Sequence, residues 1–436
     1  MSSKTKATAA TEDGIFALVP KLRFPEFRST EGWKLVTLQE ASVPVTERVG
    51  KRKLTPVSIS AGVGFVPQAD KFGRDISGNQ YELYTLISDG DFAYNKGNSL
   101  RFPQGCVYLL QGWGKAAAPN VFISFRLKGG FSNVFFQNCF DQNMHGKQLK
   151  KHITSGARSN GLLNISRENF FGVEIPTPRL IEQEKVAECL SSIDAVIAAK
   201  ARKLDALTSH KSGLLQQLFP REGESQPRLR FLDFQGKPDW LETTLGQLAK
   251  LVRGPFGGSL KKEIFVPNGY AVYEQQHAIY SDFHSFRYFI TAEKYRELRR
   301  FAVAPDDIIM SCSGTMGRFA LVPDSAAAGV INQALLKLTP NEFCDSRFLK
   351  EILELPSVQE KLLSQSAGGA IKNVVSVDQI RALPLRLPGL EEQKAVATCV
   401  GNLHDLIAAE AQMLEALKTY KRGLMQQLFP SLEEEG

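Results

Sequence analysis

Positively charged side chains gather in the first half of the chain, where their chemistry suits a polyanion. Residues 96–158 carry nine Lys or Arg but a single acidic residue, Asp141. Lys and Arg neutralise phosphates and displace counterions, and Arg, Asn and Gln can read base edges in the major groove of DNA. The imbalance therefore predicts a surface for nucleic acid. Its candidate residues are Lys51, Arg52, Lys53, Lys71, Arg74, Lys96, Arg101, Lys115, Lys147, Lys150, Lys151 and Arg158.

The second half offers a weaker version of the same chemistry. Residues 252–388 carry 16 basic and 14 acidic groups, so their charge is close to balanced. The amides of Gln275 and Gln276 could read bases, although the sequence around them favours an exposed strand end with polar side chains. Any single lysine is most often a solvated surface charge. The candidates in this half are Arg253, Lys261, Lys262, Arg287, Arg318, Lys372 and Asn373.

Catalytic constellations are missing from the sequence. The chain lacks both the GxxxxGK[ST] loop that cradles ATP phosphates and the Asn/Asp-Pro-Pro-Tyr tetrapeptide of amino-methyltransferases. Glu392-Gln393-Lys394 has the spacing of some nuclease motifs, but at the start of a helix it is typical of first-turn charge. The six cysteines form no CxxC pair, and no ligand cluster surrounds the scattered histidines. We expect no catalytic residue, no metal and no cofactor in this chain.

The chain contains a tandem repeat. Residues 182–220 and 392–430 match at 20 of 39 positions, and both end in Gly-Leu-(Leu/Met)-Gln-Gln-Leu-Phe-Pro. A second pair of matching segments begins at Leu22 and Leu229. Between these flanks the two halves are hard to align. The chain is therefore a duplication in which one part was retained and the other diverged.

Each repeated segment has the pattern of a long helix. Apolar residues follow alternating steps of four and three, and no proline interrupts them before Pro220 and Pro430. At 1.5 Å per residue, about 35 residues span roughly 50 Å. A single helix with one apolar stripe is unstable in water, so the two helices should pair with each other. The expected seam is Val186, Leu190, Ile193, Ile197, Lys200, Leu204, Leu207, Leu214 and Leu218 with Val396, Val400, Leu403, Ile407, Glu410, Leu414, Leu417, Leu424 and Leu428.

The short linker between the copies favours antiparallel pairing. This arrangement would place Lys200 and Glu410 in the same or adjacent layers, where their charges could pair or could extend into solvent. The expected fold is α+β: two globular mixed α/β parts separated by two long antiparallel coiled-coil helices, with a pseudo-two-fold internal repeat. The expected parts are a disordered N-terminus (1–21), a globular part (22–178), a helix (179–220), a linker (221–228), a second globular part (229–388), a second helix (389–430) and an acidic tail (431–436).

The location of the protein is also constrained by its composition. No stretch of about 18 apolar residues is present, so no membrane span is expected. The first ten residues lack the apolar core of a signal peptide. Unpaired cysteines are typical of a reducing compartment. We expect a cytoplasmic protein.

These features together resemble the DNA sequence-specificity subunit of Type I restriction-modification systems. The resemblance covers nearly the whole chain from about Leu22 and rests on the duplicated helix with its Gln-Gln-Leu-Phe-Pro ending. Residues 311–317 are similar to the family's Ser-x-Ser-Gly-Thr-x-Gly turn, which adds Ser313 to the DNA-binding candidates. Residues 90–96 are similar to the family's other common variant. The chain has Asp306-Asp307 where the family often has Gly-Asp.

The resemblance implies two target-recognition domains, each of which reads one half of a split, asymmetric site in double-stranded DNA. It implies that the helices act as a spacer and as a docking surface for two modification subunits, which bind S-adenosylmethionine and methylate adenine. Restriction subunits that use ATP and Mg would complete the endonuclease, so this bacterial or archaeal chain would not be catalytic by itself. The alternative is a coiled-coil scaffold with two divergent protein- or ligand-binding domains. A self-contained restriction enzyme is opposed by the missing motifs.

Overall fold

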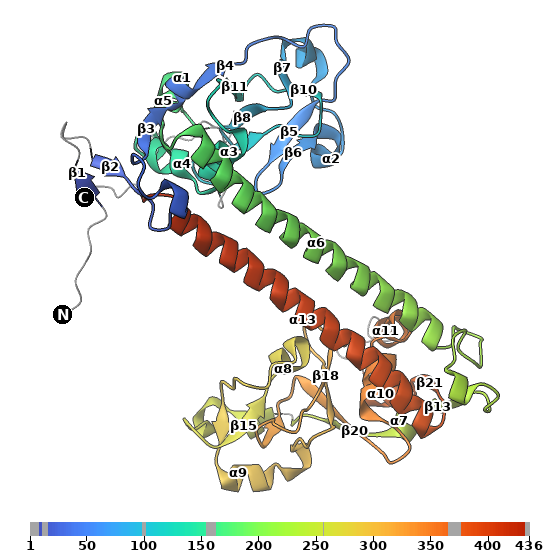
Figure 1. Ribbon diagram of the computed structural model, residues 1–436. Coiled ribbons are helices and arrows are strands. Elements are labelled where there is room, and N and C mark those ends of the chain that lie inside the picture. The colour runs from blue at the N-terminus through green and yellow to red at the C-terminus, as the bar shows by residue number, and fades with distance from the viewer. Residues whose placement is uncertain are drawn as a thin grey trace. The chain divides into compact units, whose positions relative to one another are not determined.

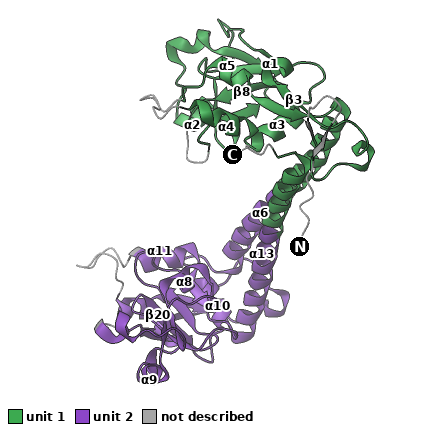
Figure 2. Cartoon of the chain, turned by 90° about the vertical axis from the view of Figure 1, so that its left-hand side faces the viewer, with its two compact units in different colours: residues 1–200, 413–436 green, residues 201–412 purple. Residues whose placement is uncertain are grey.

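The computed structural model describes residues 8–10, 16–97, 102–153, 163–255, 257–364 and 376–431. The chain divides into two units, one formed by residues 1–200 and 413–436 and the other by residues 201–412 (Figure 2). Both boundaries fall inside the repeated helices. Each unit is therefore built from parts of both copies of the repeat.

The first unit contains a four-stranded antiparallel sheet with the strand order β4-β11-β8-β9. The same unit contains three further antiparallel strand pairs, β3–β12, β5–β6 and β7–β10. The core is rich in phenylalanine; the rings of Phe92 and Phe125, on neighbouring strands, stack with their centroids 5.2 Å apart. The elements are β3 (Lys34–Thr37), α1 (Leu38–Ala41), β4 (Ser42–Pro44), β5 (Val57–Ser60), β6 (Gly64–Pro67), α2 (Gln68–Phe72), β7 (Thr85–Ser88), β8 (Asp91–Asn95), β9 (Cys106–Leu109), β10 (Lys115–Ala118), β11 (Ile123–Leu127), α3 (Asn133–Asp141), α4 (Met144–Leu149), α5 (Arg167–Phe171) and β12 (Glu174–Thr177).

The second unit contains a corresponding antiparallel sheet with the order β14-β20-β17-β18 and a strand pair, β13–β21. A three-stranded sheet, β16-β15-β19, adds a parallel pair between β15 and β19. The mixed α/β content expected from the sequence is confirmed. The elements are β13 (Leu241–Thr244), α7 (Leu245–Leu248), β14 (Ala249–Arg253), β15 (Tyr270–Tyr273), α8 (Gln275–Tyr280), β16 (Phe289–Ile290), α9 (Ala292–Glu297), β17 (Ile308–Ser311), β18 (Phe319–Leu321), β19 (Gly329–Ile331), β20 (Leu335–Pro340), α10 (Ser346–Leu353), α11 (Pro356–Ser364), α12 (Val377–Arg381) and β21 (Pro384–Leu387).

The turns that precede β8 and β17 both require a residue with a positive φ, and the two copies use different residues there. Gly90 has a φ of 95°, and Asp306 at the corresponding place has a φ of 65°. Aspartate tolerates this left-handed region better than most side chains do, which explains why Asp-Asp can replace Gly-Asp. The next residue is a buried aspartate in both copies, paired with Arg126 at 2.6 Å for Asp91 and with Lys337 at 3.5 Å for Asp307.

The two long helices are α6 (Leu180–Leu218) and α13 (Leu390–Leu428), each of 39 residues (Figure 1). In the first unit Val186 and Leu190, near the start of α6, share a core with Leu428 at the end of α13. In the second unit Leu218, at the end of α6, shares a core with Val396 near the start of α13. Within each unit, therefore, the start of one helix packs beside the end of the other.

Ion pairs join the two helices within each unit. In the first unit Lys421 Nζ lies 2.6 Å from Asp194 Oδ1. In the second unit Lys203 Nζ lies 2.6 Å from Oε1 of the buried Glu410. Lys203 lies one turn after the expected seam position Lys200, and its side chain reaches Glu410 from the edge of the seam.

Two short segments lie within the range expected to be disordered. Residues Thr8–Ala10 (β1) and Phe16–Leu18 (β2) form an antiparallel pair in the structure. In the described part of the chain, no helix combines the length and the apolar character that a membrane span requires.

Candidate nucleic-acid interface

Each long helix begins at a buried ion pair that anchors the globular part of its unit. In the first unit the guanidinium of Arg23 donates to both oxygens of Glu182 at 2.8 and 2.7 Å, and Trp33 Nε1 donates to Glu182 at 3.0 Å. In the second unit Arg230 donates to Glu392 at the same two distances, and Trp240 Nε1 donates at 3.3 Å. Burial of such a carboxylate is tolerated because both of its oxygens are bonded.

The glutamine that follows each of these glutamates ties the helix to the globular part. Gln183 accepts from the backbone N–H of Ser132 at 2.8 Å, and Gln393 accepts from that of Asp345 at 3.0 Å. Each glutamine also donates to the carbonyl of a proline five residues before it, at 2.9 Å. The glutamine therefore connects the start of α6 to the start of α3 and the start of α13 to the start of α10, in the same way in both units.

The Phe-Pro ending of each helix completes the core of the unit it reaches. Phe429 lies 5.8 Å from the Trp33 ring and 5.3 Å from the Phe135 ring. Phe219 packs in the same way on Trp240, at 5.9 Å, and on a phenylalanine of α10, at 5.3 Å. These contacts were not predicted from the sequence. The identical Phe-Pro endings of the two helices did indicate that both phenylalanines pack against equivalent residues.

Two cationic candidates of the first unit donate hydrogen bonds to backbone carbonyls. The amine of Lys71 donates to the carbonyl of Ile59 at 2.6 Å, and burial lowers its pKa. The amine of Lys96 donates to the carbonyl of Ile165 at 2.7 Å. Lys71 thus connects α2 to β5, and Lys96 connects the end of β8 to the segment before α5, so each amine has a structural contact inside the unit.

The remaining described candidates of the first unit, like Lys71, are exposed, and they fall into separate groups. Lys51, Arg52 and Lys53 lie in the loop between β4 and β5, where Arg52 pairs with Glu47 at 2.8 Å. A second group follows α3, and one of its members lines a small pocket beside Phe429 at the end of α13. This second group is Lys147, Lys150 and Lys151; Arg74 and Lys115 are also exposed, and Arg101 and Arg158 lie outside the described residues.

Three candidates of the second unit lie at or beside the turn that follows β17: Arg253, Ser313 and Arg318. Ser311 Oγ donates to the carbonyl of Thr315 at 2.6 Å and accepts from the backbone N–H of Arg318 at 3.0 Å, which closes the turn. The half-buried Arg253 lies close enough to Cys312 to oppose the rise in pKa, to about 11, that burial causes in this thiol. The other exposed candidates are Lys261, Lys262 and Arg287; Lys372 and Asn373 lie outside the described residues.

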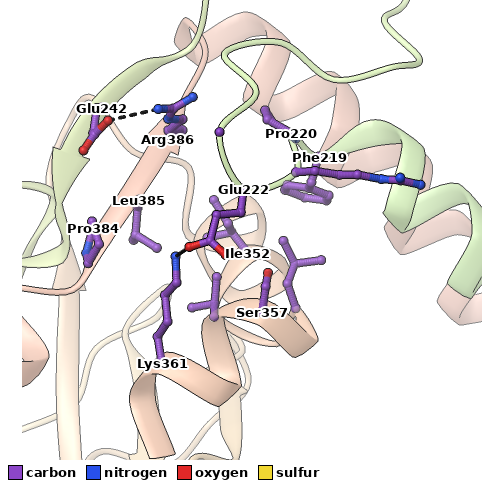
Figure 3. Close-up of a pocket in the computed structure, with 14 residues that line it drawn as sticks. Phe219, Pro220, Glu222, Glu242, Ile352, Ser357, Lys361, Pro384, Leu385 and Arg386 are labelled. Carbon is purple, nitrogen blue, oxygen red and sulfur yellow. Dashed lines mark hydrogen bonds and ion pairs between the residues drawn. The ribbon is translucent and has the colours of Figure 1, made fainter. Parts of the chain in front are cut away.

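A cavity of about 240 Å³ lies beside Phe219 and Pro220 in the second unit (Figure 3). Its rim carries two ion pairs, Lys361–Glu222 at 2.8 Å and Arg386–Glu242 at 3.1 Å. Leu385 and other apolar side chains complete the lining. Since these cations are already paired with carboxylates, the cavity does not have the character of a phosphate site.

The stability of the first unit is expected to depend on pH through His145. This side chain is buried, and burial lowers its pKa to about 4, with a smaller opposing contribution from the backbone at Gly105. The unfolded chain takes up this proton near pH 6.5, so stability should fall by about 3 kcal/mol as the pH drops from 6.5 to 4.

Urea unfolding of the first unit at pH 7 and pH 5 measures this dependence. His145→Leu should remove the part of the pH dependence that lies between 4 and 6.5, whereas His152→Leu, at a half-buried histidine of the same unit, should leave it in place. Equal pH profiles for the wild type and His145→Leu would contradict the assignment.

Comparison with known proteins finds similar sequences in one family. A family model described as the Type I restriction modification DNA specificity domain matches residues 238–419. The Type I restriction enzyme MjaVIII specificity subunit of Methanocaldococcus jannaschii is 21% identical over 286 residues, which are 64% of this chain and 66% of that protein. The putative type I restriction enzyme MjaX specificity subunit of the same organism is 24% identical over 286 residues, or 64% and 63% of the two chains. The match thus spans just under two thirds of the length of each curated relative.

Solved structures show a similar fold. The Type I restriction-modification system S subunit from M. genitalium matches with a TM-score of 0.57 and 15% identity, over 95% of this chain and all of that chain. A chain from a study of complex assembly and conformational transition in the type I R-M system matches with a TM-score of 0.54 and 17% identity, over 92% and 98% of the two chains. These matches show that residues 238–419 are similar to the Type I restriction modification DNA specificity domain, and that 64% of the chain is similar to type I restriction enzyme specificity subunits.

Proposed function

We propose that this chain is the non-catalytic subunit that gives a Type I restriction-modification complex its DNA sequence specificity. The observation that carries the proposal is the contrast between the framework and the surfaces of the two units. The anchoring Arg–Glu–Trp contacts recur with nearly the same distances, while the residues on the exposed loops differ. A conserved frame with two unlike surfaces suits a protein that reads two different half-sites.

In this proposal each unit presents one target-recognition domain to double-stranded DNA, and the two half-sites form one bipartite, asymmetric site. The helices α6 and α13 form an antiparallel coiled coil that sets the distance between the half-sites. The half-buried positions of α6 support this role, since Ile193, Ile197, Lys200, Leu204 and Leu207 recur at alternating steps of four and three. A change in the length of these helices would therefore change the number of base pairs between the two half-sites.

The partners follow from the same proposal. Two modification subunits would dock on the helices, bind S-adenosylmethionine and methylate adenine, and restriction subunits would use ATP and Mg. This chain would supply the sequence reading and the positioning of those subunits. Arg, Lys and polar side chains on its loops would make the phosphate and base contacts.

An insertion in both helices tests the spacer role. Seven residues added after Ala199 and seven after Ala409, the equivalent positions of the two copies, keep the heptad phase of the seam and lengthen each helix by about 10 Å. Since base pairs are spaced about 3.4 Å apart, the gap between the half-sites should grow by about three base pairs while both half-sites keep their bases. Mapping of methylated adenines in cells that co-express the modification subunit measures the site.

The control is a seven-residue insertion after Gly223 in the linker, which lengthens the chain without lengthening a helix and should leave the gap unchanged. If the wild-type complex methylates no bipartite sequence, the specificity function is wrong and the scaffold alternative is favoured. If the helix insertion changes the bases of a half-site and leaves the gap unchanged, the helices do not act as a spacer.

A further inference from the structure

The start of α8 and the turn after β17 form one connected surface in the second unit, although they are far apart in the sequence. Gln275, the first residue of α8, accepts a hydrogen bond from Ser313 Oγ at 2.9 Å and donates from Nε2 to the carbonyl of Thr315 at 3.4 Å. Helix α8 also packs against β17 and β18, the strands that the turn connects. We call residues 275–276 and 313–318 the reading platform.

The helix side of the reading platform is fixed by a buried histidine. His277 Nδ1 accepts from the backbone N–H of Glu274 at 2.8 Å, so Nε2 carries the proton and donates to the carbonyl of Ser285 at 3.1 Å. The imidazole is fully buried and stacks on Phe286 with the ring centroids 4.7 Å apart. These contacts hold the first turn of α8 from both sides.

The turn side of the reading platform is equally constrained. Ser311 Oγ closes the turn through the two hydrogen bonds described above, and the backbone N–H of Gly317 donates to the carbonyl of Ser311 at 3.0 Å. Gly314 and Gly317 adopt φ values of 60° and 76°, which favour glycine and allow the chain to reverse within a few residues. The polar side chains on this turn therefore start from a backbone with one defined path.

The outer surface of the reading platform carries the chemistry of base recognition. Gln276, Thr315 and Arg318 are exposed, and the half-buried Arg253 lies beside the turn at Cys312. A glutamine amide can pair with the N6 and N7 atoms of adenine, threonine can bond to several base edges, and arginine binds phosphate or guanine. The amide of Gln275, by contrast, is already used at both ends and cannot read a base without releasing the turn.

Fixed positioning separates this group from the other exposed polar side chains of the unit. Base discrimination needs a donor and an acceptor held within about 0.5 Å, and this is achieved when the supporting shell is itself bonded. The exposed Lys261 and Lys262, at the start of a 3-10 helix, present point charges whose flexible stems suit phosphates better than base edges.

We propose that Gln276 and Thr315 read bases in the half-site bound by the second unit, and that Gln275 is a positioning residue that fixes them relative to each other. This inference rests on the proposed specificity function and adds to it the residues that determine the sequence. Gln276 and Thr315 act through their side chains, whereas Gln275 acts through the Ser313 and Thr315 contacts.

The experiment maps methylated adenines for complexes of the wild type and of single variants with a co-expressed modification subunit. Gln276→Ala should lower the preference for one base, or for two adjacent bases, of one half-site about tenfold or more, since a bidentate contact contributes about this discrimination. The other half-site and the gap should not change. The control is Glu342→Ala. Glu342 is exposed and follows the end of β20, whereas Arg253 pairs with the start of that strand, so this variant should leave the base preference at every position of the site unchanged.

Variants of Gln275 separate positioning from simple stability. Gln275→Ala should relax the bases affected by Gln276→Ala and by Thr315→Val together, with a melting temperature close to that of the wild type. Gln275→Glu, which still accepts from Ser313 Oγ, should recover part of the preference. The inference would be overturned if Gln276→Ala and Thr315→Val left the methylated bases of both half-sites unchanged, or if they reduced the base preference equally at every position. In either case, a bipartite site for the wild type would still support the proposed function. A wild type without such a site would instead remove the proposed function itself.

Discussion

Replacing Phe429 by alanine is expected to destabilise the first unit by about 3–5 kcal/mol, the range typical of a large-to-small change at a buried aromatic residue. Phe429 is 2% exposed and fills the space between Trp33 and Phe135. The loss should be large because the cavity is lined by rigid rings that cannot collapse into it. Urea unfolding followed by tryptophan fluorescence measures the change, since Trp33 reports on the site directly.

The matched control is Tyr420→Ala, which removes an aromatic ring on the same helix that is 60% exposed, and should change stability by less than about 1 kcal/mol. Phe219→Ala should have the corresponding effect on the second unit, because Phe219 packs on Trp240. If Phe429→Ala and Tyr420→Ala behaved alike, the Phe-Pro ending would not be a core element.

Replacing Glu182 by alanine is expected to cost about 3–5 kcal/mol, because it leaves the buried guanidinium of Arg23 without its carboxylate and removes the acceptor of Trp33 Nε1. The Arg23 and Glu182 side chains are only 6% and 3% exposed, so water cannot replace the lost contacts. Thermal unfolding of the variant measures the loss.

Two further variants distinguish the buried ion pair from a general effect of charge. Glu188→Ala removes an exposed carboxylate from the same helix and should change stability by less than about 0.5 kcal/mol. The double variant Arg23→Met/Glu182→Leu should recover much of the stability, because an apolar pair of similar volume avoids the unpaired charge. A single Glu182→Ala variant as stable as Glu188→Ala would show that the ion pair contributes little.

The long helices could be predicted because their evidence is local. Steps of three and four from Val186 to Leu218, with lysines at positions 200 and 211 and apolar residues at the others, specify a helix and its buried stripe, and the second copy repeats the pattern. The antiparallel packing followed from the short linker, and within each unit the structure has the start of one helix beside the end of the other.

The candidate site could be predicted only as a distribution of charge. Counting lysines does not show that the amines of Lys71 and Lys96 are bonded to backbone carbonyls, because this depends on how distant loops fold. The contact between Gln275 and Ser313 joins residues 38 positions apart, and no sequence period marks it. The Asp306 turn departs from the glycine pattern and yet keeps the left-handed backbone, so the backbone requirement persisted while the residue changed.

The contribution of Phe219 and Phe429 to the opposite copy's core has a consequence for how the protein tolerates cleavage. A protease cut in the segment 221–228 would leave two fragments, each of which holds the aromatic side chain that the other needs. The nicked protein should therefore stay assembled under native conditions, and neither fragment should be stable after separation in denaturant unless it finds a second copy of itself. Because of this mutual dependence, a substitution that destabilises the core of one half should also destabilise the other half, even where the exposed loops of the two halves evolve independently.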